Sequence, residues 1–161
     1  MTERKRVLIG LVAGLVWSVS LLVVAALYVT IPVFALIPTI MTAFFGPGLV
    51  LTAMIGCVSH RRFSKGKFTG PLSEAGEIDR SVVQNTTEQL VIAAAIWPAA
   101  AVILGPYGPG VIVVLGIGFT LARLIFWFGS HNGPAMRAAG FAGTYFPTIL
   151  VALWALATLV S

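Results

Sequence analysis

The chain has 161 residues, of which 58% are hydrophobic and 9% are charged. Because soluble domains carry roughly 25% charged residues, this composition excludes a water-soluble surface and predicts an all-α integral membrane protein. The net charge of +5 does not indicate nucleic-acid binding, because the basic residues flank apolar segments, where membrane topology explains them. The length suits a single membrane domain over residues 1–161.

In chain order, the apolar segments long enough to cross a bilayer are 7–29, 34–58, 83–104, 110–129 and 137–160. Each has at least the about 20 residues that a helix needs to span the hydrocarbon core. The first segment follows basic residues as a signal peptide does, but it exceeds a signal h-region of roughly 7–15 residues, so we read it as a retained span. Because Pro32, Pro38 and Pro47 interrupt residues 30–58, a four-span alternative stays open.

The distribution of basic residues predicts the orientation. With a cytoplasmic N-terminus, five spans place residues 4–6, the polar stretch 59–82 and Arg137 on one side, and the outer connections 30–33 and 105–109 carry no charge. This pattern follows the positive-inside rule. We therefore expect a cytoplasmic N-terminus, and the compact loops favour a bacterial inner membrane. Anionic lipid headgroups are the expected partners of four of the loop residues: Arg61, Arg62, Lys65 and Lys67.

Polar residues open the third span. Ser81 and Gln84 fit a capping box and predict a helix that begins there, whereas Asn85 and Glu88 are spaced i, i+3 on one face. At the helical rise, Glu88 lies about 24 Å and Arg123 about 20 Å below the turn at 105–110. We expect these two charges to pair, within one subunit or between adjacent subunits. The alternative is that the pair is purely structural.

Further basic residues lie on the same side. Arg137 begins the fifth span, where a helix N-terminus attracts anions, and Arg62 and Arg80 add positive charge. Together they predict a basic mouth above a polar recess that suits a small ligand with carboxylates. The prediction requires Glu88 to face a deep arginine and not bulk water. Cys57 is interpreted as a small buried hydrophobe, and no histidine spacing indicates a metal site.

Two motifs resemble the membrane-associated proteins in eicosanoid and glutathione metabolism, the MAPEG family. One is an acidic-basic stretch leading to Asn-x-x-Glu, seen as residues 77–80 followed by Asn85 and Glu88. The other is Ala-Arg-Leu followed by aromatics, a glycine and a further arginine, seen as residues 122–124, 126–129 and Arg137. The arginine pair at residues 61–62, after an earlier span, also matches the pattern of the family. The resemblance covers roughly residues 34–160.

This resemblance implies a four-helix bundle over residues 34–160, with 7–29 as an extra N-terminal span, assembled as a homotrimer. It implies that glutathione binds between subunits near the cytoplasmic face and that a hydrophobic small molecule is its co-substrate. Arg137 matches the arginine that activates the glutathione thiol, since a nearby cation favours the nucleophilic thiolate. The residues that match or neighbour glutathione contacts are Asn85, Glu88, Arg123, Arg80, Arg62 and Gln84.

The chain departs from the enzymes of that family at three positions. Ser81 replaces an arginine, Phe126 replaces a histidine or tyrosine, and Ser130 replaces an aromatic hydroxyl. The leading hypothesis is a glutathione transferase or peroxidase acting on hydrophobic electrophiles. The alternatives are a non-catalytic membrane scaffold, a protein that binds lipid or another anion, and a small transporter in which Glu88 and Arg123 form a relay.

Overall fold

The computed structural model of the chain describes residues 2–64 and 72–161. Lys65 and Lys67, for which lipid contacts were predicted, lie outside the described residues. The elements are helical throughout this part of the chain. They are α1 (Glu3–Tyr28), the short 3-10 helix η1 (Val33–Ala35), α2 (Leu36–Ala43), α3 (Phe45–Ser64), α4 (Glu74–Ile103), the 3-10 helix η2 (Gly105–Tyr107), α5 (Gly108–Asn132) and α6 (Pro134–Val160).

Five stretches of the described chain are long and apolar enough to cross a membrane, which confirms the predicted spans. The second of them, Val33–Ser64, contains η1, α2 and α3 and forms one span of 32 residues despite its prolines. The break between α2 and α3 falls at Phe44. Proline has no backbone N–H, so Pro47 cannot donate to the carbonyl of Ala43, and the helix restarts around it.

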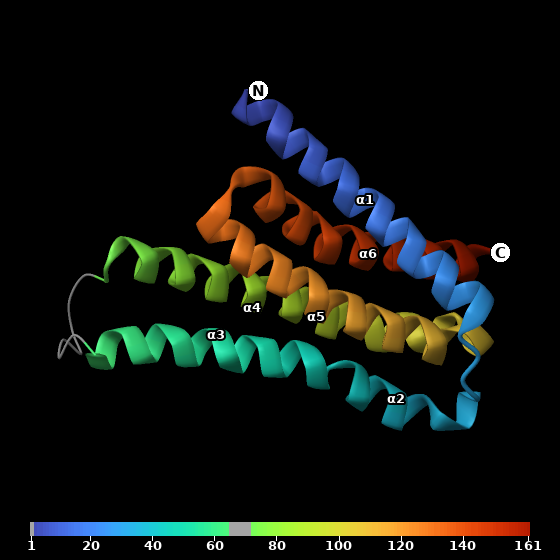
Figure 1. Cartoon of the computed structure of the whole chain (residues 1–161). Coiled ribbons are helices and arrows are strands. Elements are labelled where there is room, and N and C mark those ends of the chain that lie inside the picture. Colours follow the sequence, from blue (N-terminus) through green and yellow to red (C-terminus); the bar gives the residue numbers. More distant parts are fainter. Residues whose placement is uncertain (1, 65–71) are drawn as a thin grey trace.

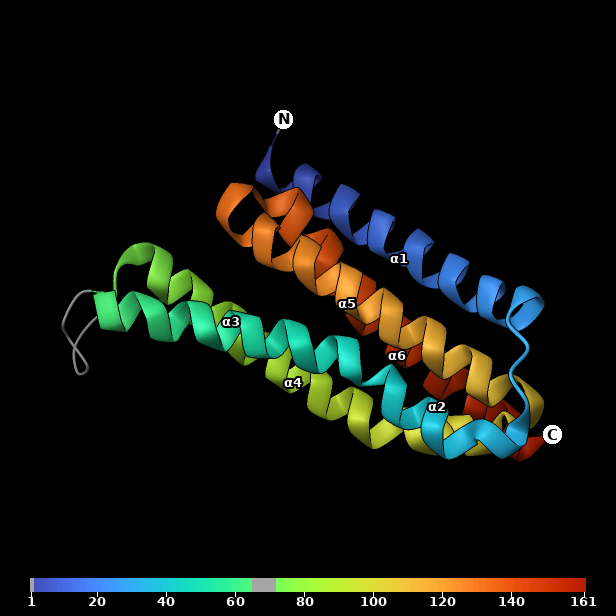
Figure 2. The same cartoon turned by 60° about the horizontal axis from the view of Figure 1, so that its bottom comes forward.

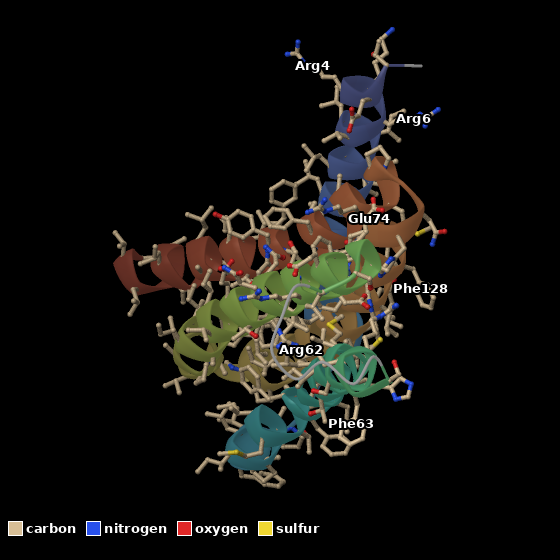
Figure 3. The ribbon with its side chains drawn as sticks, turned by 90° about the vertical axis from the view of Figure 1, so that its left-hand side faces the viewer. Arg4, Arg6, Arg62, Phe63, Glu74 and Phe128 are labelled. Atoms are coloured by element: carbon tan, nitrogen blue, oxygen red, sulfur yellow. The ribbon has the colours of Figure 1, made fainter. Side chains whose placement is uncertain are left out.

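The helices form an elongated bundle in which α1 lies against α6, on the far side of α5 from α2 and α3 (Figures 1 and 2). The start of α1, the end of α3, the start of α4 and the turn between α5 and α6 share one end of the bundle. This end carries the predicted cytoplasmic residues. Viewed from this side, Arg4 and Arg6 extend outward from α1, and Arg62 lies at the end of α3 (Figure 3).

Small residues hold the extra helix α1 close to α6. Gly10 and Gly14 face α6, and a Cβ atom at Gly14 would collide with the Cβ of Ala142. Small residues let membrane helices approach closely, so that van der Waals contacts between the two helices are extensive. The opposite face of α1 exposes large apolar side chains such as Leu8, Val12 and Val19, as a lipid-facing surface does.

The core of the bundle is apolar and centres on Trp97, which is 1% exposed. Its ring packs against Phe44 and Phe119, and its Nε1 donates to the Thr148 hydroxyl at 3.3 Å. A second, smaller cluster lies between α3, α4 and α5 and includes Met54, Val82 and Phe126. This second cluster leads from the apolar core to the end of the bundle where the polar residues gather.

The predicted start of the third membrane helix is wrong. The helix α4 begins at Glu74, after the N-cap Ser73, and Ser81 lies inside it. The polar residues before Ser81 form an amphipathic extension of the helix, because Gly76, Asp79 and Val82 continue its buried face. Acidic residues in the first turn, Glu74 and Glu77, also favour a start at that point, since they complement the helix dipole.

Candidate functional site

A cavity of about 450 Å³ opens among α1, α4, α5 and α6 at the loop-rich end of the bundle. Arg137, Asn85 and Ser81 supply polar groups to its wall, and Glu3 supplies a carboxylate. Apolar side chains, among them Phe126, complete the lining. An apolar cavity with a few converging polar groups is the usual form of a small-molecule site.

Asn85 connects this cavity to a buried arginine. The Arg123 guanidinium donates to the Asn85 Oδ1 at 2.9 Å and to the Thr86 hydroxyl at 3.5 Å. Its second terminal nitrogen donates to the Thr144 hydroxyl, which in turn donates to the Gln89 side chain at 2.6 Å. Because the Oδ1 of Asn85 is taken by Arg123, the amide NH₂ of Asn85 is left to donate to a ligand in the cavity.

The charge of Arg123 has no negative partner within the described part of the chain. Its side chain is 0% exposed, its hydrogen-bond partners are neutral, and the rings of Phe119 and Phe126 lie 5.4 and 4.8 Å from its Cζ. Arginine stacked on aromatic rings gains some cation–π stabilisation, but the positive charge itself is not neutralised. An anion bound beside Asn85 would be attracted by this charge.

The predicted pairing of Glu88 with Arg123 is wrong within a single chain. Glu88 is exposed and accepts a hydrogen bond from the Gln84 amide at 3.1 Å. Glu88 therefore does not face a deep arginine, and Asn85 supplies the contact with Arg123 instead. The predicted depth of this part of α4 is correct, since Asn85 and Thr86 reach Arg123.

The rotation of α4 explains why Glu88 points elsewhere. Residues advance about 100° each around a helix, and the buried face of α4 runs through Thr86, Gln89 and Ala93. Asn85 lies at the edge of that face, about 40° from Gln89. Glu88 lies about 100° from Gln89, so its side chain points out of the bundle. Pairing with an adjacent subunit remains a prediction.

Arg137 is set at the cavity by the turn between α5 and α6. The backbone at Gly129 packs directly against the backbone of Arg137, where a Cβ would collide. Arg137 is exposed and forms no ion pair with the carboxylates of the described residues. It also lines a neighbouring cavity of about 470 Å³ with Glu74 and Glu77. Its guanidinium is therefore available to a ligand.

The remaining predicted site residues do not line this cavity within one chain. Arg80 and Gln84 are exposed on α4, and Arg62 lies at the end of α3. None of them is among the described residues that line the cavity. Their assignment to a ligand stays a prediction for an assembly of more than one chain.

A second polar cluster lies at this end of the bundle and was not predicted from the sequence. Asp79 is 1% exposed, and its carboxylate lies 2.7 Å from Arg61 Nε and 2.7 Å from His131 Nε2. It accepts a hydrogen bond from Trp127 Nε1 at 2.9 Å, and the Cys57 thiol lies 3.7 Å away. The cluster ties α3, α4 and α5 together. Cys57 is therefore more than an apolar packing residue.

The only sequence signal for this cluster was the spacing of Asp79. It lies three residues before Val82 and ten before Gln89, which places all three on one helical face. The prediction assigned a role to the neighbouring Arg80, which is exposed, and gave none to Asp79. Because its acid and its arginine compensate each other, the cluster acts as a clamp between helices and offers no unpaired charge to a ligand.

Comparison with known proteins gives one result. The family model described as "MAPEG family" matches residues 37–157, which agrees with the range of the motif resemblance. A search of curated proteins and a search of solved structures returned no match. The match covers most of the chain, includes the cavity residues of α4, α5 and α6, and leaves out α1. The chain belongs to the MAPEG family.

Proposed function

We propose that this protein binds glutathione in the cavity between α1, α4 and α6 and uses it to modify hydrophobic electrophiles that enter from the membrane. The observation that supports the proposal most directly is the meeting of Asn85, held by the uncompensated Arg123, with Arg137 at one cavity. Glutathione carries carboxylates for the amide donor and a thiol for the cation. Family membership supports the same ligand class.

Arg137 would act on the glutathione sulfur. A cation close to a thiol stabilises the thiolate, which is the reactive nucleophile. In an addition reaction, the sulfur forms a bond to the electrophilic carbon and the proton released from the thiol returns to the adduct. Reduction of a hydroperoxide would consume a second glutathione instead. The apolar wall around Phe126 suits a hydrophobic co-substrate.

The test measures the thiolate and the binding separately. Glutathione added to purified protein in nanodiscs should produce the ultraviolet difference absorbance of a thiolate, and S-methylglutathione should bind without it. The variant Arg137→Leu should lose the thiolate signal while it still binds S-methylglutathione. If millimolar glutathione gives neither a thiolate signal nor a thermal shift, the proposal fails.

One observation favours a second candidate, a non-catalytic protein that binds an anion or lipid. Phe126 contributes only an aromatic ring to the cavity wall, at a position where the family enzymes carry a polar ring, and Ser130 donates its hydroxyl to the backbone carbonyl of Phe126 at 2.8 Å. This candidate predicts that Arg137→Ala leaves ligand binding and thermal stability nearly unchanged. The thiolate measurement separates the two functions.

The assembly and its placement also belong to the proposal. We infer a homotrimer, in which the exposed Glu88 and Gln84 of α4 could reach a neighbouring chain. The domain would comprise a family bundle over 34–160 with α1 added before it. The N-terminus would be cytoplasmic, in a bacterial inner membrane, because the start of α1, the end of α3 and the start of α6, which carry basic residues, share one end of the bundle.

A further inference from the structure

The helix α1 lies outside the family match and yet forms one wall of the cavity. Glu3, Val7 and Leu11 line it at a spacing of four residues, so they share one face of α1. The glycines of α1 bring that helix against α6, with Gly10 beside Ala135 and Ala138. This chain therefore supplies one wall of the cavity from a segment that the family match does not include.

This wall brings a carboxylate to a cavity that is otherwise basic. Glu3 is the one acidic side chain among the described residues that line it. The acid of the family motif, Glu88, is exposed elsewhere on α4 and is bonded to Gln84. The neighbouring cavity holds Glu74 and Glu77, with Arg137 and Ser81 common to both. Within one chain, a cationic group of a ligand in the first cavity would therefore meet Glu3.

Glutathione carries such a group, the ammonium of its γ-glutamyl residue. We propose, on the basis of the function proposed above, that Glu3 is a specificity-determining residue that receives this ammonium. Arg137 and Asn85 then serve the thiolate and a carboxylate, so the cavity selects a ligand with both signs of charge. The helix α1 thus acts as a recognition element in addition to a membrane span.

The experiment compares glutathione with its deamino analogue, glutaryl-cysteinyl-glycine, on full-length protein in nanodiscs. The wild type should prefer glutathione by about 1.5- to fivefold in Kd, the range expected for an accessible ion pair. Glu3→Gln should bring the preference close to one. Glu88→Gln tests the rival assignment, in which the motif acid of an adjacent chain receives the ammonium; Glu88 does not line the cavity of its own chain, so we expect the preference to survive. Melting temperatures of both variants verify folding.

The outcomes separate this inference from the proposed function. If the wild type binds glutathione but Glu3→Gln keeps the preference, Glu3 does not receive the ammonium and the inference is overturned. Loss of the preference in Glu88→Gln alone would overturn it as well and would assign the ammonium to the motif acid. If the wild type binds neither peptide, both the proposed function and this inference are refuted.

Discussion

Replacing Arg123 by methionine should weaken ligand binding strongly while changing stability little. The guanidinium donates to Asn85, Thr86 and Thr144. Hydrogen bonds in membrane proteins contribute about 0.6–1.7 kcal/mol each, so these bonds stabilise the fold by about 2–5 kcal/mol. Burial of an arginine in a spanning helix costs about 2.5–3.5 kcal/mol on insertion scales, and no described carboxylate offsets it. The two contributions nearly cancel in Arg123→Met.

Binding has no such cancellation. In Arg123→Met, the amide of Asn85 is no longer held with its NH₂ toward the cavity, and the positive charge behind it is gone. A hydrogen bond to a charged group contributes about 1.5–3 kcal/mol, so the Kd for glutathione should rise about 10- to 150-fold. Arg123→Lys keeps the charge but cannot reproduce the planar fork, so an intermediate loss is expected.

The assay pairs isothermal titration of glutathione with thermal unfolding in the same nanodiscs. Trp97→Phe is the control, because it removes a buried hydrogen bond to Thr148 in the apolar core, away from the cavity. This control should lower the melting temperature and leave the Kd unchanged. Wild-type affinity in Arg123→Met, or a loss no larger than that of the control, would refute the role given to Arg123.

Three other predictions concern the clamp, α1 and the topology. Asp79→Asn removes the ion pair with Arg61 and should lower the free energy of unfolding by about 1–3 kcal/mol in thermal denaturation; an unchanged melting temperature would contradict it. Gly14→Val should cost about 1–3 kcal/mol because its side chain meets α6, whereas Gly48→Ala, with nothing within 4 Å, should not destabilise. Accessibility labelling should place Ser161 and the N-terminus on opposite sides of the membrane; labelling of both from one side rejects five spans.

The spans were predictable because hydrophobicity and helical rise act along one dimension. The length of each apolar segment predicted where a helix crosses the membrane, and the rise per residue predicted that Asn85 of α4 lies at the depth of Arg123. Rotation about the helix axis was harder to predict from the sequence. It depends on which face of the helix packs, and Asn85 and Glu88, three residues apart, differ by only about 60° around the axis. The prediction turned Glu88 toward Arg123, whereas the structure turns Asn85 toward it.

The amphipathic start of α4 shows a second limit. Polar residues next to an apolar run were read as a loop because a membrane span is expected to begin where hydrophobicity rises. The helix extends beyond that point, and Asp79 is buried there by partners from α3 and α5. Its contacts with Arg61 and His131 span 18 and 52 residues of sequence, and no local pattern encodes such pairings.

The two polar clusters at this end differ in one respect that bears on function. Asp79 is surrounded by cationic and N–H donors, so its charge is satisfied within the chain. Among the described residues, Arg123 has only neutral oxygen acceptors and aromatic rings around it, so its charge is not satisfied. If both clusters served only to hold the helices together, an acidic partner for Arg123 would be expected, as Asp79 is for Arg61. The uncompensated charge lies behind the amide that lines the cavity, where an anionic ligand would supply the missing partner, and this placement favours a binding site over a second clamp.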